Sequence, residues 1–218
     1  MNRAGPFIGS SIGKKVVMAL SGAVLFGFVI AHLLGNLQVY EGPEKLDAYG
    51  AALRRLPALL WSARIVLLVS VVAHIWSATS LTLMNRAARP QEYRLRRYRE
   101  ADYASRTMRW SGVILLAFII YHLLDLTFGR VNPDFVEGSV YHNLVASFQS
   151  VPVAAFYVVA MLLLGLHLYH GIWSMLQTLG LSHPRYEALR RRVAGAVTGI
   201  IVLGNVSIPV AVQAGWVR

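Results

Sequence analysis

Five long apolar stretches constrain the fold of this 218-residue sequence more than any other feature. As a helix, a stretch of about 20 apolar residues spans the hydrocarbon core of a bilayer, which is about 30 Å thick. The sequence therefore predicts an all-α fold, an integral membrane five-helix bundle that forms a single transmembrane domain over residues 1–218. We expect the spans at about 15–40, 58–85, 108–129, 151–180 and 193–216.

The composition supports a membrane protein and excludes several kinds of chemistry. Hydrophobic residues make up 56% of the chain and charged residues only 14%, whereas a soluble domain averages about 25% charged residues. The chain contains no cysteine, which excludes disulfides, thiolate nucleophiles, Cys-ligated zinc and iron-sulfur clusters. Any chemistry must therefore use histidines, carboxylates or a cofactor.

Basic residues are divided unevenly between the two expected faces of the membrane. The face with the N-terminus carries 15 Lys and Arg against four acidic residues, and the other half of the chain carries six of each. Because positive residues near span ends stay cytoplasmic, we expect a cytoplasmic N-terminus and an outside C-terminus in the cell inner (cytoplasmic) membrane. The first stretch follows Lys14 and Lys15 but is longer than a signal peptide's apolar region and lacks a clear cleavage site, so we expect a retained helix.

The segment from Arg86 to Arg109 contains eight arginines interleaved with Tyr93, Tyr98 and Tyr103. Such a segment is compatible with nucleic-acid binding, but membrane topology and attraction to anionic lipid explain it more simply. We therefore expect lipid contact and no nucleic-acid partner. A soluble protein docked on this face is compatible with the same charges.

Four of the seven histidines lie inside four different apolar stretches: His32, His74, His122 and His167. An unsatisfied polar group is costly to bury in hydrocarbon, so each imidazole needs a partner. A bond to a backbone carbonyl would explain one such histidine. One on each of four successive helices favours a shared function.

The depths of these histidines divide into two levels. At about 1.5 Å of rise per residue, His32 and His122 lie about 12 Å from the outer ends of their helices. His74 and His167 lie about 23 to 25 Å from the same ends. Two imidazoles from non-adjacent helices at each level predict two b-type haems with bis-histidine ligation. Zinc is the competing interpretation, but a tetrahedral zinc site needs its ligands at one level.

A Ser-Gly pair begins 11 residues before the first of these histidines and again before the third: Ser21-Gly22 and Ser111-Gly112. Each serine shares the face of its histidine about 16 Å deeper, at the level of the inner haem. Small residues there would admit the haem ring, and the hydroxyls could bond its substituents. Ordinary small-residue helix packing explains the pattern equally well.

Other polar residues in the spans are candidates for the haem environment. His170 lies three residues after His167 and is the alternative ligand, although depth favours His167. Arg64 lies about 10 Å from the outer end, where it would pair with a haem propionate or extend toward the headgroups. Asp125 follows His122 by one turn and could orient that ligand, meet a quinone or reach outer water. We expect two further histidines to be exposed: His142 and His183.

Together these residues resemble the di-haem cytochrome b membrane-anchor subunit of the succinate dehydrogenase/fumarate reductase (complex II) family. The resemblance rests on the five spans, the four-histidine pattern and the segment from His167 through Gly171-Ile172-Trp173-Ser174, and it extends from about Ser11 to Val212. It implies that a flavoprotein and an iron-sulfur subunit dock on the basic cytoplasmic face. Electrons would then pass between these subunits, which serve the tricarboxylic acid cycle, and a membrane quinone.

The resemblance also implies roles for individual residues. His32 and His122 would hold an outer, low-potential haem, and His74 and His167 would hold the inner haem. Menaquinone is favoured over ubiquinone, because relatives with two haems and five helices often use it. A quinone headgroup needs polar contacts at the end of a span, and the candidates by this criterion are Arg64 and Asp125 on the outer side and Ser11 and Ser21 on the inner side.

One departure from some relatives concerns a transmembrane proton path. Those relatives carry an acidic residue beside the fourth-helix ligand, whereas Gly165 and Leu166 precede His167 here, so we do not expect that path. The chain also has no glycine-rich flavin fingerprint, which implies a non-catalytic electron-transfer and quinone-binding subunit. Two alternatives stay open: a standalone di-haem transmembrane reductase, and a haem-free scaffold or transporter in which the histidines relay protons.

Overall fold

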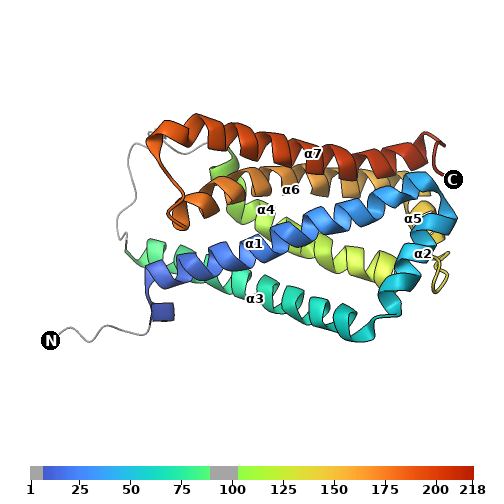
Figure 1. Cartoon of the computed structure of the whole chain (residues 1–218), viewed down its shortest axis with the longest axis horizontal. Helices are drawn as coiled ribbons and strands as arrows, with labels where there is room; N and C mark the ends of the chain where they lie inside the picture. Colours follow the sequence, from blue (N-terminus) through green and yellow to red (C-terminus); the bar gives the residue numbers. More distant parts are fainter. Residues whose placement is uncertain (1–6, 89–102) are drawn as a thin grey trace.

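The computed structural model describes residues 7–88 and 103–218. The regular structure in these residues is helical, without strands, and five helical segments are long and apolar enough to span a membrane (Figure 1). These candidate spans are Ser11–Glu41, Pro57–Ala87, Thr107–Thr127, Val151–Thr178 and Pro184–Gln213. The prediction of an all-α fold with five spans is therefore confirmed.

Short sequence signals set where several helices begin. Ser10 accepts a hydrogen bond from the backbone N–H of Gly13 at 3.0 Å and so caps the first long helix. Pro43 and Pro57 lie in first turns, where the missing N–H of proline is not needed. In chain order the elements are η1 (Phe7–Gly9), α1 (Ser11–Asn36), η2 (Leu37–Glu41), α2 (Pro43–Arg54), α3 (Pro57–Ala87), α4 (Tyr103–His122), the π-helical turn η3 (Leu123–Thr127), α5 (Val140–Gln149), α6 (Val151–Thr178), η4 (Pro184–Tyr186) and α7 (Glu187–Gln213).

The five long helices run side by side along the length of the bundle (Figure 1). α1 packs along α3, and α4 packs along α6, which also packs along α7. A buried cluster of Leu33, Leu168 and Ile201 joins α1, α6 and α7, and Phe26 packs against it. The bundle thus contains two helix pairs, α1–α3 and α4–α6, held together through α6 and α7.

Two short helices, α2 and α5, lie at the end of the bundle where α1 ends (Figure 1). α5 lies between the spans expected at about 108–129 and 151–180, where the sequence predicts no helix. Asp47 of α2 accepts hydrogen bonds from the Tyr141 backbone N–H at 2.8 Å and the Ser139 hydroxyl at 3.2 Å, which caps the start of α5. Leu46 of α2 and Phe148 of α5 are buried beneath them. Helices this short cannot cross a bilayer, so a search for long apolar stretches does not find them.

Three long helices begin earlier than the predicted spans. α1 begins at Ser11, α4 at Tyr103 and α7 at Glu187, whereas the apolar stretches begin at about residues 15, 108 and 193. The additional turns carry basic residues such as Lys14 and Arg190. Apolar length marks only the part of a helix that crosses hydrocarbon, so it underestimates a helix that continues into the headgroup region.

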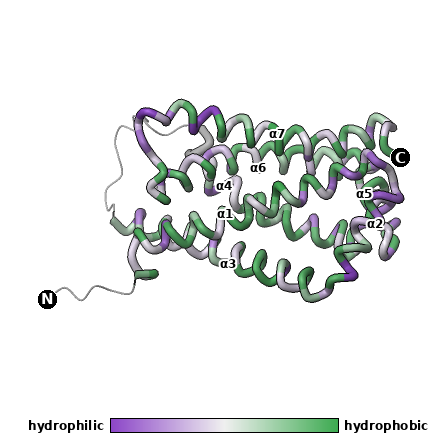
Figure 2. The backbone as a smooth tube through the Cα atoms, viewed as in Figure 1, coloured by the Kyte–Doolittle hydropathy of each residue, from purple (hydrophilic) through white to green (hydrophobic). Residues whose placement is uncertain are grey.

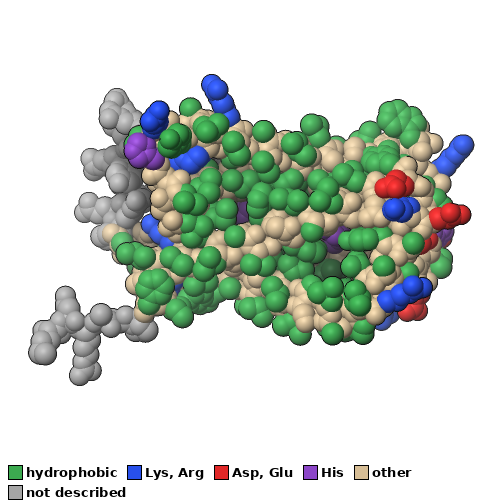
Figure 3. All heavy atoms as spheres, in the orientation of Figure 1, with side chains coloured by type: hydrophobic (Ala, Val, Ile, Leu, Met, Phe, Trp, Pro, Cys, Tyr) green, Lys and Arg blue, Asp and Glu red, His purple; other side chains and the backbone are tan. Residues whose placement is uncertain are grey.

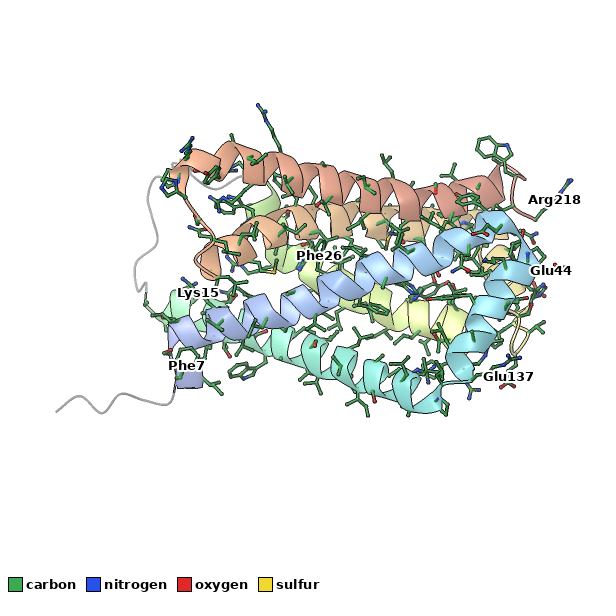
Figure 4. All side chains as sticks on the ribbon, viewed as in Figure 1. Phe7, Lys15, Phe26, Glu44, Glu137 and Arg218 are labelled. Carbon is green, nitrogen blue, oxygen red and sulfur yellow. The ribbon has the colours of Figure 1, made fainter. Side chains whose placement is uncertain are left out.

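Polar residues concentrate toward the two ends of the bundle, and apolar residues cover its middle (Figures 2 and 3). The end that carries α2 and α5 has acidic and basic residues, among them Glu44, Glu137 and Arg218, while Lys15 lies at the opposite end (Figure 4). The described basic residues on the helix ends that meet there are Lys14, Lys15, Arg86, Arg109, Arg185, Arg190, Arg191 and Arg192. Arg3, Tyr93, Tyr98 and the arginines at 89–99 lie outside the described residues.

Tryptophans mark both ends of the apolar surface. Trp61 near the start of α3, Trp110 near the start of α4 and Trp216 after α7 are 59%, 75% and 81% exposed, respectively. Tryptophan is enriched at the interfaces between membrane and water. Their positions therefore agree with a bilayer around the middle of the bundle.

Gly165 allows α6 to approach α7 closely, because a Cβ at this position would lie 2.7 Å from Cγ2 of Val202. We predict that Gly165→Ala destabilises the bundle by about 1–3 kcal/mol, the usual cost of overpacking, and lowers the thermal midpoint of unfolding in detergent. Gly171→Ala is the matched control, since a Cβ there has no neighbour within 4 Å. Equal midpoints for the two variants would contradict this packing.

Candidate functional site

Four histidines from four long helices meet in two pairs. The ring centroids of His32 and His122 lie 5.8 Å apart with an interplanar angle of 88°. Those of His74 and His167 lie 6.1 Å apart with an angle of 57°. In Figure 3, histidine atoms are visible at two separate places along the middle of the bundle, recessed below apolar side chains. The structure thus brings together the same histidines that helix depth pairs in the sequence.

His74 on α3 is oriented by residues of α1. Its Nδ1 lies 3.2 Å from the Met18 carbonyl oxygen and 3.3 Å from the Ser21 hydroxyl. That hydroxyl donates its hydrogen to the Val17 carbonyl at 2.7 Å, so both neighbours of Nδ1 act as acceptors. We assign the imidazole proton to Nδ1, which leaves the lone pair on Nε2.

His167 on α6 is oriented in the same way by α4. Its Nδ1 lies 3.4 Å from the Ser111 hydroxyl, which donates to the Met108 carbonyl at 3.1 Å. The serines of the repeated Ser-Gly pairs therefore contact imidazoles, a contact that neither interpretation of the pattern, haem bonding or small-residue packing, includes. Depth along one helix does not reveal this contact, because the imidazole belongs to the neighbouring helix.

The glycines of these pairs leave room beside the same two rings. A Cβ at Gly22 would lie 3.3 Å from Cε1 of His74, and a Cβ at Gly112 would lie 3.9 Å from Cε1 of His167. The first contact is tighter than ordinary van der Waals packing, so any larger residue at Gly22 would press on the imidazole.

His122 belongs to a hydrogen-bonded group at the other level. Its Nδ1 lies 3.4 Å from the Tyr157 hydroxyl, which donates to Oδ2 of Asp125 at 2.8 Å. The Ser147 hydroxyl donates to the same oxygen at 2.6 Å. Asp125 is only 1% exposed, so the interpretation in which it reaches outer water is wrong. Ser147 of α5 and Tyr157 of α6 enclose it, and α5 was absent from the prediction.

A comparison with protein-family models matches residues 82–207 to the succinate dehydrogenase/fumarate reductase transmembrane subunit. The match covers more than half of the chain. The chain belongs to this family. Searches of curated proteins and of solved structures gave no match.

This transmembrane subunit is a multi-pass membrane protein of the complex II type, and its family associates with the other subunits of that complex. The matched segment contains His122 and His167 and the helices that orient them, α4 and α6. His32 and His74 precede it. Their place in the site therefore rests on the geometry of the two pairs.

The other predicted site residues of the subunit lie apart from the pairs or at their edge. Arg64 is exposed, with its guanidinium 5.0 Å from the centre of the Trp61 ring. Ser11, the first residue of α1, is exposed at the basic end. The His170 ring lies 6.0 Å from the Trp173 ring, whereas His167 is the histidine that faces His74. His142 and His183 are exposed, as predicted.

The separations within the pairs fit a metal centre held by two imidazoles. A metal ion about 2 Å from each donor nitrogen places the ring centroids about 6 Å apart, close to the observed 5.8 Å and 6.1 Å. Orientation through Nδ1 leaves Nε2 to act as the metal ligand. Within residues 7–88 and 103–218, no group of three or more His, Asp or Glu is arranged to hold a metal ion, in contrast to the cluster that tetrahedral zinc requires.

Two functional candidates, Tyr157 and Ser147, were missed in the sequence. Tyr157 lies five residues after Pro152 in the fourth apolar stretch, about 8 Å along the helix and close to the depth of His122. A buried tyrosine hydroxyl usually has a hydrogen-bonding partner, which was a usable signal. Ser147 gave none, because it precedes the apolar stretch.

Proposed function

We propose that this chain is the membrane-anchor cytochrome b subunit of a succinate:quinone oxidoreductase. It carries electrons between an iron-sulfur subunit and a membrane quinone through two b-type haems. His32 and His122 hold the outer haem, and His74 and His167 hold the inner one. The observation that carries this proposal is the pair of facing imidazole couples inside the bundle of a complex II family member.

Bound haem iron would accept and release one electron at a time. The chain itself binds and orients the haems. Ser21 and Met18 hold the His74 ring, and Ser111 holds the His167 ring. Two bound haems at these two levels would shorten each electron step across the membrane.

The uneven distribution of basic residues between the two ends of the bundle supports an orientation of the complex in the membrane. The end with α1's first turn is the cytoplasmic side, in the cell inner membrane, because positive residues near span ends stay cytoplasmic. Its lysines and arginines form the docking side for the flavoprotein and iron-sulfur subunits. The C-terminus then lies outside. Menaquinone is the favoured quinone, with Arg64 the outer candidate for its headgroup and Ser11 the inner one.

One prediction of the proposed function concerns the haems themselves. Purified protein, expressed with haem available, should contain two b haems per chain in a pyridine haemochrome assay. His74→Ala and His167→Ala should abolish one low-spin spectral component, and His32→Ala and His122→Ala the other, while His170→Ala retains both. Folded wild-type protein without haem would overturn the proposed function, and crossed losses would overturn the pairing.

The space beside His74 gives a second prediction. Gly22→Val should reduce the spectral component that depends on His74, because its side chain presses on that imidazole. Gly27→Val is the matched control on the same helix, since a Cβ at Gly27 has no neighbour within 4 Å. Difference spectra of reduced minus oxidised membranes measure both, and equal losses in the two variants would count against this steric explanation.

Copurification tests the assignment to complex II. We expect two soluble subunits to copurify with the tagged chain, whereas a standalone reductase would purify alone. Lys14→Gln with Lys15→Gln should lower the salt concentration at which these subunits dissociate, because docking charges are screened by salt. Lys45→Gln with Arg55→Gln, at the opposite end, should leave that concentration unchanged.

A further inference from the structure

Asp125 is a carboxylate enclosed in the protein at the level of the outer histidine pair. It is 1% exposed and lies in the π-helical turn η3, directly after α4. Both of its hydroxyl donors, Ser147 at 2.6 Å and Tyr157 at 2.8 Å, bond the same oxygen, Oδ2. Both hydroxyls donate to the carboxylate, which accepts from each of them. Groups from α5 and α6 therefore hold Asp125 in place.

Tyr157 connects this carboxylate to His122. Its hydroxyl has one hydrogen and donates it to Asp125, so it faces the His122 Nδ1, 3.4 Å away, with a lone pair. The ring of Tyr157 is held edge-on by Phe118 and Phe148, with centroid distances of 5.1 Å and 4.8 Å. A fixed ring keeps the hydroxyl between the two polar groups. Asp125, Tyr157 and His122 thus form one directed chain of hydrogen bonds.

In the described part of the chain, the inner pair has neutral groups in the corresponding places. The Nδ1 atoms of His74 and His167 face serine hydroxyls and, for His74, a backbone carbonyl. The first half of the internal repeat also lacks a carboxylate like Asp125. The residue three positions after His32 is Gly35, where a Cβ would lie 2.8 Å from the Tyr49 ring. The packing of α1 against α2 leaves no room for an acidic side chain there.

We propose that Asp125 and Tyr157 are positioning residues that lower the reduction potential of the haem held by His32 and His122. This inference rests on the proposed function. A carboxylate that accepts through a bridging hydroxyl increases the electron donation of the ligand imidazole. A nearby negative charge also stabilises the oxidised, more positive iron, and ligand hydrogen bonding is one of the ways a protein sets haem potential. Among the described residues, the Nδ1 contacts of the inner pair are serine hydroxyls and a backbone carbonyl, without a carboxylate.

The test compares Tyr157→Phe and Asp125→Asn with wild type in the intact complex by redox titration. In both variants we expect the component that depends on His32 to become easier to reduce. The expected change is roughly tenfold in its reduced-to-oxidised ratio at a fixed potential, equivalent to about 59 mV for one electron. The electron paramagnetic resonance signal of that haem should shift as well, because the orientation of its ligand changes. The other component should stay unchanged.

Ser111→Ala is the matched control, since it removes the Nδ1 partner of His167 and should move only the inner component. Asp125→Asn should have a smaller effect in the Tyr157→Phe background than in wild type, because the carboxylate acts through the hydroxyl. Asp125→Asn keeps the size of the side chain and one acceptor oxygen. This variant can therefore be used for the test if the Tyr157→Phe protein does not assemble into the complex. The inference would be overturned if the reduction potential of the outer haem did not change in these variants, or if both haems shifted equally. Two bound haems in the same samples would still support the proposed function. Absence of haem from the wild type would overturn the function itself.

Discussion

The need to satisfy imidazole nitrogens inside an apolar bundle governs the arrangement of this protein. A polar ring nitrogen buried without a partner is costly, and lipid offers none. For His74, His122 and His167 the bundle supplies a partner to Nδ1 from the adjacent helix. The second ring nitrogen, Nε2, then remains available inside the bundle. Pairing of α1 with α3 and of α4 with α6 is what places these partners beside the rings.

The two helix pairs surround their imidazoles in the same way at the level of His74 and His167, but in different ways at the level of His32 and His122. At the inner level a Ser-Gly pair faces an imidazole in both halves of the chain. At the outer level only the second half has a carboxylate, Asp125, because Gly35 in the first half is packed against Tyr49. An internal repeat thus carries two chemically different sites. In the proposed di-haem protein, that difference separates the properties of the two haems.

The short helices α2 and α5 contribute more than a connection between spans. Asp47 of α2 caps α5, and α5 brings Ser147 to the buried Asp125. The carboxylate therefore depends on a segment outside the spans for one of its two hydroxyl donors. Shielding by α5 also explains why Asp125 does not face outer water, although its position close to the end of a span suggested that it could.

The sequence by itself determined the five spans, the uneven charge of the two ends and the two levels of histidine. These features depend on apolar length and on helical rise, which are local properties and can be read along one chain segment. Only the tertiary structure decided that Ser21 and Ser111 contact imidazoles, that Tyr157 lies between His122 and Asp125, and that Arg64 lies over Trp61. Such contacts depend on how each helix is rotated against its neighbour. Rotation results from side-chain packing across the bundle, which no single stretch of sequence contains.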